Sequence, residues 1–191
     1  RNDPINYGPK WKNIRVQVRQ RDDYRCQVCG IRETDREHDI HHKIPFRAFS
    51  SHVQANRLDN LVTLCQSCHQ RAETIVRVKS GLSGVSYVLR HLAPIFLMCD
   101  VRDLAVHSDV KSSLAGGKPS IVLYDQIPAG LGLSKHLYNI HDDLLNNALE
   151  LISNCDCYDG CPSCVGPGGE EGSGGKEEAK AILGQLTNIL N

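Results

Sequence analysis

The sequence predicts an α+β protein made of two small domains, residues 1–78 and 79–191. Short strand-like segments alternate with segments of helical period along the 191 residues, which is the pattern of a mixed architecture. Charge is uneven, because residues 1–77 hold 14 of the 22 Lys and Arg but only 9 of the 22 Asp and Glu. Eight of the nine cysteines fall into two separate groups, one in each half. A basic half joined to an acidic half favours two domains, with any polyanionic partner on the first.

The composition argues against two classes of protein. A hydrophobic content of 40% and a charged content of 23% are those of a globular chain rather than a disordered one. The longest apolar run, LAPIFLM at residues 92–98, is too short to cross a bilayer, so no membrane partner is expected. No charged stretch followed by an apolar one opens the sequence, so we expect no secretory signal and a cytoplasmic location.

The first domain is expected to begin with a short basic helix over residues 11–25, where Trp11, Ile14 and Val18 recur at helical spacing. The next apolar segment, EHDIHHKIPF, is typical of a short strand that ends at Pro45. After a polar loop, NLVTLCQSCHQRAE predicts a second strand that leads into a helix. The predicted order is therefore helix, strand, strand, helix.

Two Cys-x-x-Cys pairs lie in this domain, Cys26 with Cys29 and Cys65 with Cys68. Two such pairs separated by a few dozen residues are typical of a four-thiolate zinc site. Disulfides are the alternative, but thiolate-bound zinc suits a reducing compartment. We therefore expect a closed structural zinc, which would stabilise a domain too small to bury much apolar surface.

The second domain is predicted to open with an amphipathic helix over residues 82–96, kinked by Pro94. The apolar run SIVLYD predicts a strand over residues 120–125. Two further helices are expected, one from about Leu137 and one near the C-terminus, separated by a glycine-rich segment. The second domain is therefore expected to mix helices with at least one strand.

The remaining cysteines are concentrated in the motif CDCYDGCPSC, with a single one elsewhere. The motif has the spacing C-x-C-x3-C-x2-C, which is compact enough for one tetrahedral zinc. Cys99 is interpreted as a buried thiol. The expected ligands of this second structural zinc are Cys155, Cys157, Cys161 and Cys164.

The segments RDDYRCQVCG, HDIHHKIPF and LDNLVTLCQSCH, in this order, closely resemble the HNH endonuclease family. The resemblance covers about residues 11–75 and implies the ββα-metal fold, a hairpin packed on a helix. It implies that His42 is the general base, that His41 and His69 bind a catalytic divalent metal, and that Asn60 orients the base and its loop. The adjacent histidines would then have separate tasks, one on water and one on the metal.

Phosphodiester hydrolysis explains why these residue types are needed. A histidine with a pKa near neutral can take a proton from the attacking water. A divalent ion with open coordination positions can neutralise the charge that develops on the phosphate. The expected cofactors are two structural zinc ions and one catalytic ion, which is Mg, Mn, Ni or Zn.

Basic residues around these motifs are candidates for contact with DNA phosphates, which would make binding sensitive to salt. For any one of them, an ordinary solvated surface charge remains an equal alternative. No base-reading module is recognised, so weak sequence preference is expected. The candidates are Arg21, Lys43, Arg47 and Arg71.

The segments HLAPIFLMCDVRDLAVH, IVLYDQIPAGLGLSKHLYN and CDCYDGCPSC resemble the C-terminal zinc-binding domain of DEAD/DEAH-box helicases of the mitomycin-repair and phage-defence types. This resemblance covers about residues 80–191 and implies an association with a helicase rather than a reaction. AGGKPS lacks the Ser or Thr that follows Lys in a phosphate-binding loop, and no other nucleotide-binding motif is present. A helicase motor is therefore expected in cis, beyond this chain, or in trans.

Together the two resemblances imply a metal-dependent DNA endonuclease that acts with a helicase in phage defence or DNA repair. The alternative is a non-cleaving module that binds DNA or serves as a scaffold at the C-terminus of a larger helicase. An intact set of His41, His42, Asn60 and His69 argues for cleavage, because a binding module has no need of a base.

Overall fold

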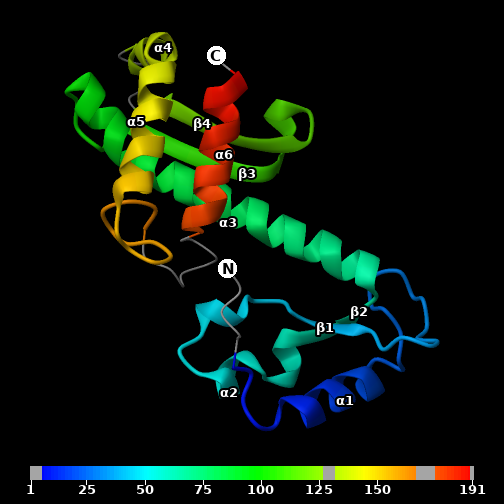
Figure 1. Cartoon of the computed structure of the whole chain (residues 1–191). Coiled ribbons are helices and arrows are strands. Elements are labelled where there is room, and N and C mark those ends of the chain that lie inside the picture. Colours follow the sequence, from blue (N-terminus) through cyan, green and yellow to red (C-terminus); the bar gives the residue numbers. More distant parts are fainter. Residues whose placement is uncertain (1–5, 127–131, 167–174, 190–191) are drawn as a thin grey trace. The chain divides into compact units, whose positions relative to one another are not determined.

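The computed structural model describes residues 6–126, 132–166 and 175–189 (Figure 1). The chain divides into two compact units, Arg1–Val76 (unit 1) and Arg77–Asn191 (unit 2). Helices and two-stranded sheets occur in both units, so the predicted α+β class is confirmed. None of the helices in the described ranges combines the length and the apolar character needed to cross a bilayer.

Unit 1 is a small hairpin with helices around it. Strands β1 and β2 pair antiparallel, with Asp39 opposite Leu64 and His42 opposite Leu61. This register places the His41–His42 pair at the end of β1 that is followed by the loop back to β2. The elements of unit 1 are α1 (Trp11–Arg21), β1 (Asp39–His42), η1 (Phe46–Ala48), α2 (His52–Ala55), η2 (Leu58–Asn60), β2 (Leu61–Leu64) and the first part of α3 (Gln66–Leu97).

The first helix is shorter than the sequence predicted. It ends at Arg21 instead of Arg25, because Asp23 and Tyr24 adopt φ angles of 52° and 53°, which are incompatible with a helix. These two left-handed residues turn the chain directly into the first cysteine pair. The turn is held by hydrogen bonds from the Tyr24 amide to the Arg19 carbonyl (2.8 Å) and from the Glu33 amide to the Tyr24 carbonyl (2.9 Å).

A buried ion pair closes unit 1 on the side of α1. The guanidinium of Arg19 donates two hydrogen bonds to the Glu33 carboxylate, of 2.8 and 2.9 Å. Both side chains are only 10% exposed. Burial tends to raise the pKa of Glu33, but the hydrogen bonds from Arg19 and from the His38 amide outweigh it and leave the pKa lowered. Glu33 is therefore held as a carboxylate, which fixes the segment after the first cysteine pair to α1.

Helix α3 is one continuous element from Gln66 to Leu97, where the sequence predicted two separate helices. It passes Gly81 and Gly84 without a break and includes Pro94. A Cβ at Gly81 would lie 2.6 Å from the Cδ1 atom of Ile182 and 3.0 Å from the Glu178 carbonyl oxygen, both in α6. Glycine is needed here for close helix packing and not for a turn, which explains why it does not end the helix.

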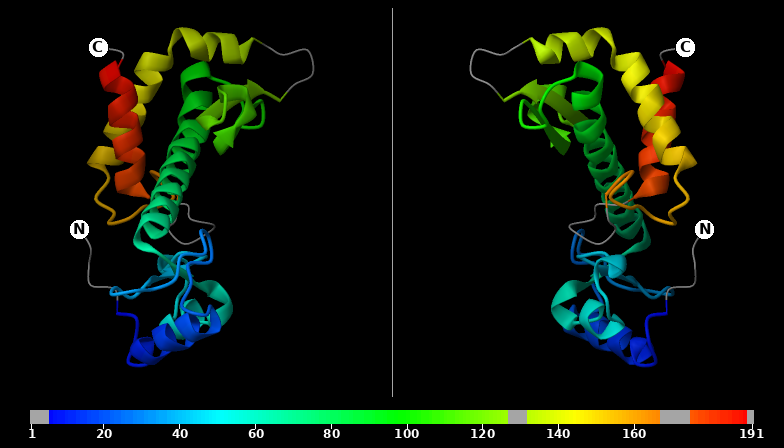
Figure 2. Two further views of the ribbon diagram at one scale, coloured as in Figure 1. Left: turned by 90° about the vertical axis from the view of Figure 1, so that its right-hand side faces the viewer. Right: turned by 90° about the vertical axis from the view of Figure 1, so that its left-hand side faces the viewer.

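Unit 2 contains a second hairpin and three further helices. Strands β3 and β4 pair antiparallel, with Leu104 opposite Asp125. Helices α5 and α6 lie side by side, and Figure 2 shows α3 between this pair and the hairpin. The sequence predicted β4 but not β3. The elements are α3 beyond Val76, β3 (Leu104–Ser112), η3 (Ser113–Ala115), β4 (Lys118–Asp125), α4 (Leu133–Asn139), α5 (His141–Asn154) and α6 (Lys176–Ile189).

The core of unit 2 is apolar and draws on nearly every element. Buried side chains from α3, β3, α4, α5 and α6 meet in one cluster. Its members include Val85, Leu89, Leu144, Ile152 and Leu183, each at most 3% exposed. Cys164 joins this cluster, so one thiol of the second cysteine group borders the apolar core.

Candidate functional site

Two histidines and a glutamate converge in unit 1. His41 lies in β1, whereas His69 and Glu73 lie one turn apart near the start of α3. The Oε1 atom of Glu73 is 3.1 Å from Nδ1 of His41 and 3.6 Å from Nε2 of His69. One potential ligand atom from each of the three residues lies within 4.8 Å of the others. Two imidazoles and one carboxylate are suitable ligands for one divalent ion and leave coordination positions for water and substrate.

Glu73 was not among the residues expected from the sequence. A signal for it was present, because residues four apart share one face of a helix and HQRAE places Glu73 four residues after His69. Only the hairpin, which brings His41 beside that helix face, identifies Glu73 as a partner of both histidines.

Asp39 faces the other nitrogen of His69. Its Oδ2 atom lies 4.0 Å from Nδ1 of His69, while Nε2 of the same ring faces Glu73. A carboxylate near the second nitrogen of a metal-binding histidine helps to fix the orientation of the ring. The separation is too long for a direct hydrogen bond, so in this structure Asp39 contributes negative charge beside His69 rather than a tight contact.

His42, which follows His41 in β1, packs among aromatic side chains. Its ring is parallel to those of Tyr7 and Trp11, with centroid distances of 5.7 and 5.4 Å, and edge-on to Phe46 at 5.5 Å. His42 is 9% exposed, and its Nε2 atom is 2.9 Å from Oδ1 of Asn56. Burial lowers the pKa of His42, although the hydrogen bond with Asn56 opposes the shift. A neutral imidazole is the form that accepts a proton.

Asn60 fixes the loop that follows β1. Its Oδ1 atom accepts a hydrogen bond of 2.8 Å from the Ile44 amide, and its Nδ2 donates to the carbonyls of Ile44 and Ala55. In the hydrogen bonds of the described residues, the partner of the His42 ring is Asn56 and not Asn60. Asn60 thus acts on the loop, and the sequence offered no signal for Asn56.

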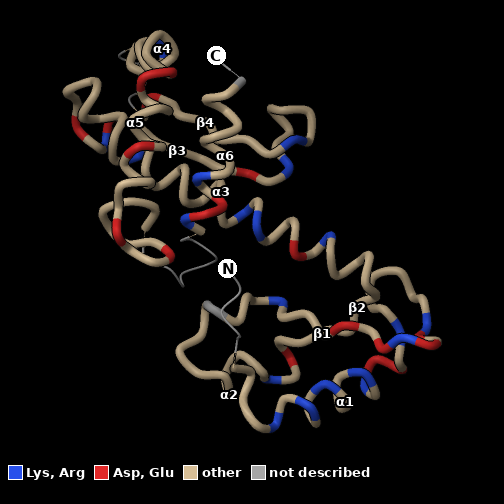
Figure 3. Tube along the Cα trace, viewed as in Figure 1, with Lys and Arg blue, Asp and Glu red and all other residues tan. Residues whose placement is uncertain are grey.

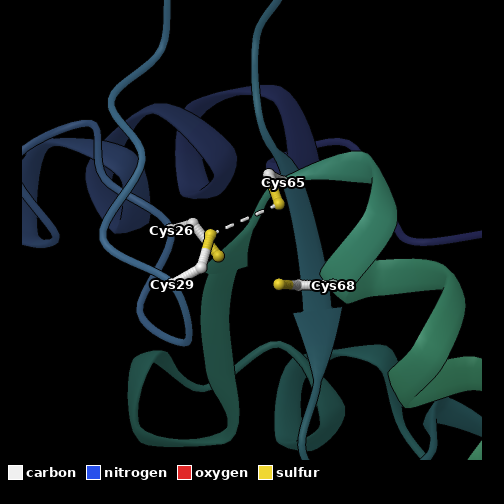
Figure 4. Close-up of side chains that lie close together, drawn as sticks. All are labelled: Cys26, Cys29, Cys65 and Cys68. Carbon is white, nitrogen blue, oxygen red and sulfur yellow. Dashed lines mark hydrogen bonds between the residues drawn. The ribbon is translucent and has the colours of Figure 1, made fainter.

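The four cysteines of unit 1 form one compact cluster. Figure 4 shows the pair Cys26 and Cys29 facing Cys65 and Cys68. The Cys29 and Cys65 sulfurs are 3.7 Å apart, close to the roughly 3.8 Å expected between thiolates arranged tetrahedrally around zinc. Hydrogen bonds from the Ser67 hydroxyl and the Cys68 amide lower the pKa of Cys65 to about 6, whereas the neighbouring thiols raise the pKa of Cys29 to about 11, so the support for a zinc site is the geometry of the four sulfurs.

The cysteines of unit 2 form a second cluster of the same kind. The Cys157 and Cys164 sulfurs are 3.4 Å apart, and the Cys161 sulfur is 3.6 Å from those of both Cys155 and Cys164. All nine cysteines are free, so the disulfide alternative is not supported. The buried ammonium of Lys176, at the start of α6, donates to the Cys155 carbonyl and, at 2.9 Å, to the Cys157 carbonyl.

Comparison with protein families gives one match in each unit. Residues 26–74 match the HNH endonuclease model, and residues 85–165 match the model of the MrfA Zn-binding domain. The chain therefore joins a segment that matches the HNH endonuclease model to a segment that matches the MrfA Zn-binding domain model. Both resemblances expected from the sequence are confirmed, and the two cysteine clusters support two structural zinc sites.

Known proteins similar to this chain include helicases and one uncharacterized protein. The uncharacterized ATP-dependent helicase YprA of Bacillus subtilis is 41% identical over 106 residues, which are 56% of this chain and 14% of the helicase. The uncharacterized protein MJ1572.1 of Methanocaldococcus jannaschii is 34% identical over 86 residues, which are 44% of this chain and 77% of that protein. A crystal structure of the DUF1998 helicase MrfA bound to DNA matches with a TM-score of 0.51 and 38% identity, over 60% of this chain and 15% of that one. This chain thus spans about one seventh of the helicases that it matches.

The basic residues of the HNH domain differ in how many hydrogen bonds their side chains already make within the protein. Arg21 donates to Asp22 and to the carbonyls of Leu58 (2.6 Å) and Leu61 (2.9 Å), so its main contacts are internal. Lys43 is exposed and donates to the Asp59 carbonyl, and Arg71 donates to the Cys68 sulfur at 3.3 Å. The side chain of Arg47 lies outside the described part of the structure. Figure 3 shows further Lys and Arg residues along α1.

Proposed function

We propose that this chain is a metal-dependent DNA endonuclease whose HNH domain hydrolyses phosphodiester bonds with His42 as general base. The observation that carries the proposal is the convergence of His41, His69 and Glu73, from β1 and α3, next to a buried histidine. These residues supply the two elements that the reaction requires, a site for a divalent ion and a neutral proton acceptor.

Each side chain has a distinct task in the proposed reaction. His41, His69 and Glu73 would hold the ion, and Asp39 adds negative charge beside His69. A bound divalent ion supplies positive charge for the phosphate and for the leaving oxygen. His42 accepts the proton of the attacking water, and Asn60 keeps the loop after β1 in place.

The ligand set favours some ions over others. Mg²⁺ prefers oxygen ligands and gives up its waters reluctantly, whereas imidazoles suit transition metals. Two imidazoles and one carboxylate therefore favour Mn²⁺ or Ni²⁺ over Mg²⁺ in the proposed site.

A helicase motor is the proposed partner, in cis beyond this chain or in trans. The support is the match of residues 85–165 to the MrfA Zn-binding domain and the likeness to a helicase crystallised with DNA. In this proposal the motor moves along DNA, the HNH domain of residues 1–78 cuts it, and residues 79–191 connect the two. Phage defence or DNA repair in the cytoplasm is the corresponding biological role.

Metal-dependent cleavage of supercoiled plasmid tests the proposal. The zinc-loaded protein is incubated with DNA in buffer free of divalent ions and with added Mg²⁺, Mn²⁺ or Ni²⁺. We expect nicked or linear product only with added metal, and the highest rate with Mn²⁺ or Ni²⁺. Glu73→Gln is expected to require more metal for the same rate, whereas the exposed neighbour Gln70→Ala behaves as wild type. DNA binding without cleavage under every condition would support the alternative, a non-cleaving module, and contradict the proposal.

A further inference from the structure

The side chain of Asn56 joins the candidate base to the backbone near the N-terminus. Its Oδ1 atom is 2.9 Å from Nε2 of His42, and its Nδ2 donates a hydrogen bond of 2.7 Å to the Tyr7 carbonyl. Asn56 is 5% exposed, so water does not readily replace either contact. It lies at the end of α2, where its amide donates to the His52 carbonyl.

The Tyr7 carbonyl determines which way the Asn56 amide points. A carbonyl oxygen can only accept a hydrogen bond, so the NH₂ group of Asn56 must face Tyr7. The amide oxygen then faces His42, and it too can only accept. The nitrogen of His42 that meets it must therefore carry a hydrogen. In a neutral imidazole this leaves Nδ1 as the nitrogen with the free lone pair.

We propose that Asn56 is a positioning residue that holds His42 as the Nε2–H tautomer, so that Nδ1 is the proton acceptor. The role in catalysis rests on the proposed nuclease function, whereas the tautomer follows from the contacts alone. In the proposed step a water O–H bond breaks, its proton moves to Nδ1, and the oxygen forms a bond to phosphorus. The bond from phosphorus to the leaving sugar oxygen breaks, and that oxygen takes the electron pair and a proton from solvent.

The segment that carries Tyr7 is itself closely packed, which gives Asn56 a fixed partner. The Tyr7 ring stacks on Trp11 at 4.6 Å and on His42 at 5.7 Å. Gly8 has a φ of +83°, and a Cβ there would lie 2.4 Å from Cδ2 of His52. This φ is one that residues other than glycine rarely adopt, so a substitution at Gly8 is expected to strain the turn that presents the Tyr7 carbonyl to Asn56.

The tautomer can be observed directly, without any cleavage assay. Long-range proton–nitrogen NMR correlations of the ¹⁵N-labelled, zinc-loaded chain distinguish protonated from unprotonated ring nitrogens, and loss of one ring in the His42→Gln spectrum assigns the signals. We expect Nε2 of His42 to be protonated and Nδ1 not. In Asn56→Ala we expect this single pattern to be replaced by an average of both tautomers. An Nδ1–H tautomer in the wild type, or an unchanged pattern in Asn56→Ala, would overturn the proposal.

Single-turnover cleavage with added Mn²⁺ then tests the role in catalysis. Asn56→Ala is expected to lower the rate about 10- to 100-fold, as for other residues that orient a histidine through a hydrogen bond, with little change in DNA affinity. Gln54→Ala, exposed on the same helix, is the matched control and is expected to cleave as wild type. Gly8→Ala, which leaves both Asn56 and His42 in place, is expected to lower the rate by displacing the Tyr7 carbonyl.

The outcomes separate the two claims. A wild-type protein that shows the Nε2–H tautomer but never cleaves DNA contradicts the nuclease function and, with it, a catalytic role for Asn56. Cleavage that is unaffected by Asn56→Ala, together with an Nδ1–H tautomer, overturns the positioning role while the nuclease function stands. An equal loss of rate and of DNA affinity in Asn56→Ala would assign Asn56 to folding alone and also overturn the positioning role.

Discussion

The buried clusters of the two units differ in composition. In unit 1, Cys26, Cys65 and Cys68 form a buried cluster with a single aliphatic residue, Leu64. In unit 2, helices α3 to α6 and strand β3 bury a far larger apolar cluster, in which only Cys164 is a candidate zinc ligand. Candidate zinc ligands therefore make up most of the buried cluster of unit 1. In unit 2 they lie at the edge of the apolar cluster.

The two zinc sites also close loops of very different length. Cys29 and Cys65 are separated by 36 residues, and the segment between them contains His41, His42 and Asn60. Cys155 to Cys164 span one short loop after α5. A link that closes a longer loop removes more entropy from the unfolded chain. Zinc in unit 1 thus organises the candidate active site, whereas zinc in unit 2 organises a local turn.

Removal of one zinc at a time should have the largest effect and tests this comparison directly. Cys29→Ser should lose one zinc and unfold unit 1, because structural zinc binding contributes about 10–16 kcal/mol in small domains. Cys161→Ser should also lose one zinc but keep the helices of unit 2. Elemental analysis and hydrogen exchange resolved by residue measure both effects. Equal loss of protection in the two units would show that they do not differ in this way.

The ion pair between Arg19 and Glu33 should be the next most important contact in unit 1. Glu33→Gln removes the buried carboxylate that binds the Arg19 guanidinium and leaves only the exposed Glu37, at 2.8 Å, as counter-charge, so we expect a loss of about 2 kcal/mol in unfolding free energy. Arg57→Gln removes an exposed pair with Asp59 and should change stability by less than about 1 kcal/mol. Chemical denaturation monitored by Trp11 fluorescence measures both variants. Similar values for the two would mean that burial does not strengthen the Arg19–Glu33 contact.

Lys176 provides the corresponding test in unit 2. Lys176→Met removes a buried ammonium from the Cys155 and Cys157 carbonyls, which should cost about 2 kcal/mol and speed the release of zinc from that cluster. Lys180→Met, on the same helix and paired with Glu177 at 3.8 Å, is the matched control. Zinc release to a coloured chelator gives the rates. Equal rates in the two variants would make Lys176 an ordinary surface contact.

The smallest expected effect concerns DNA affinity. Lys43→Gln should weaken binding only a few-fold and lower the slope of log K against log salt by about 1, as for a single phosphate contact. Lys118→Gln, exposed on β4 of the acidic unit 2, should leave both quantities unchanged. Fluorescence anisotropy with a labelled duplex at several salt concentrations measures them. An equal loss for Lys118→Gln would place DNA contacts in both units.

Local spacing explains what could be predicted from the sequence. Each cysteine group is recognisable because ligands two or three residues apart already lie on one turn, and the two resemblances rest on such short motifs. Glu73 and Asn56 depend instead on long-range packing. Glu73 becomes a partner of His41 only when α3 lies beside the hairpin, and Asn56 meets His42 only through the fold of the loop and of the segment at Tyr7.

Helix boundaries and strand β3 were missed for similar reasons. Left-handed backbone is usually marked by glycine in a sequence, but here Asp23 and Tyr24 adopt it. The end of α1 was therefore expected at Arg25. A helix after the second cysteine pair and another over residues 82–96 were expected, but α3 runs continuously through Gly81 and Gly84, where α6 packs closely. The segment of β3, LAVHSDVKS, has polar residues in its middle and so lacks the continuous apolar run that predicted β4. It is a strand because it pairs with β4, a contact that its own sequence does not indicate.

The role of His42 as general base can be tested by single-turnover cleavage of a labelled duplex by the wild type and by His42→Ala, with DNA binding measured in parallel. With saturating Mn²⁺ we expect the wild type to cleave and the variant to lose about 10²- to 10⁴-fold in rate, the usual contribution of a general base, while its affinity for DNA is unchanged. Cleavage at the wild-type rate by a folded His42→Ala protein would contradict the assignment of His42 as the base.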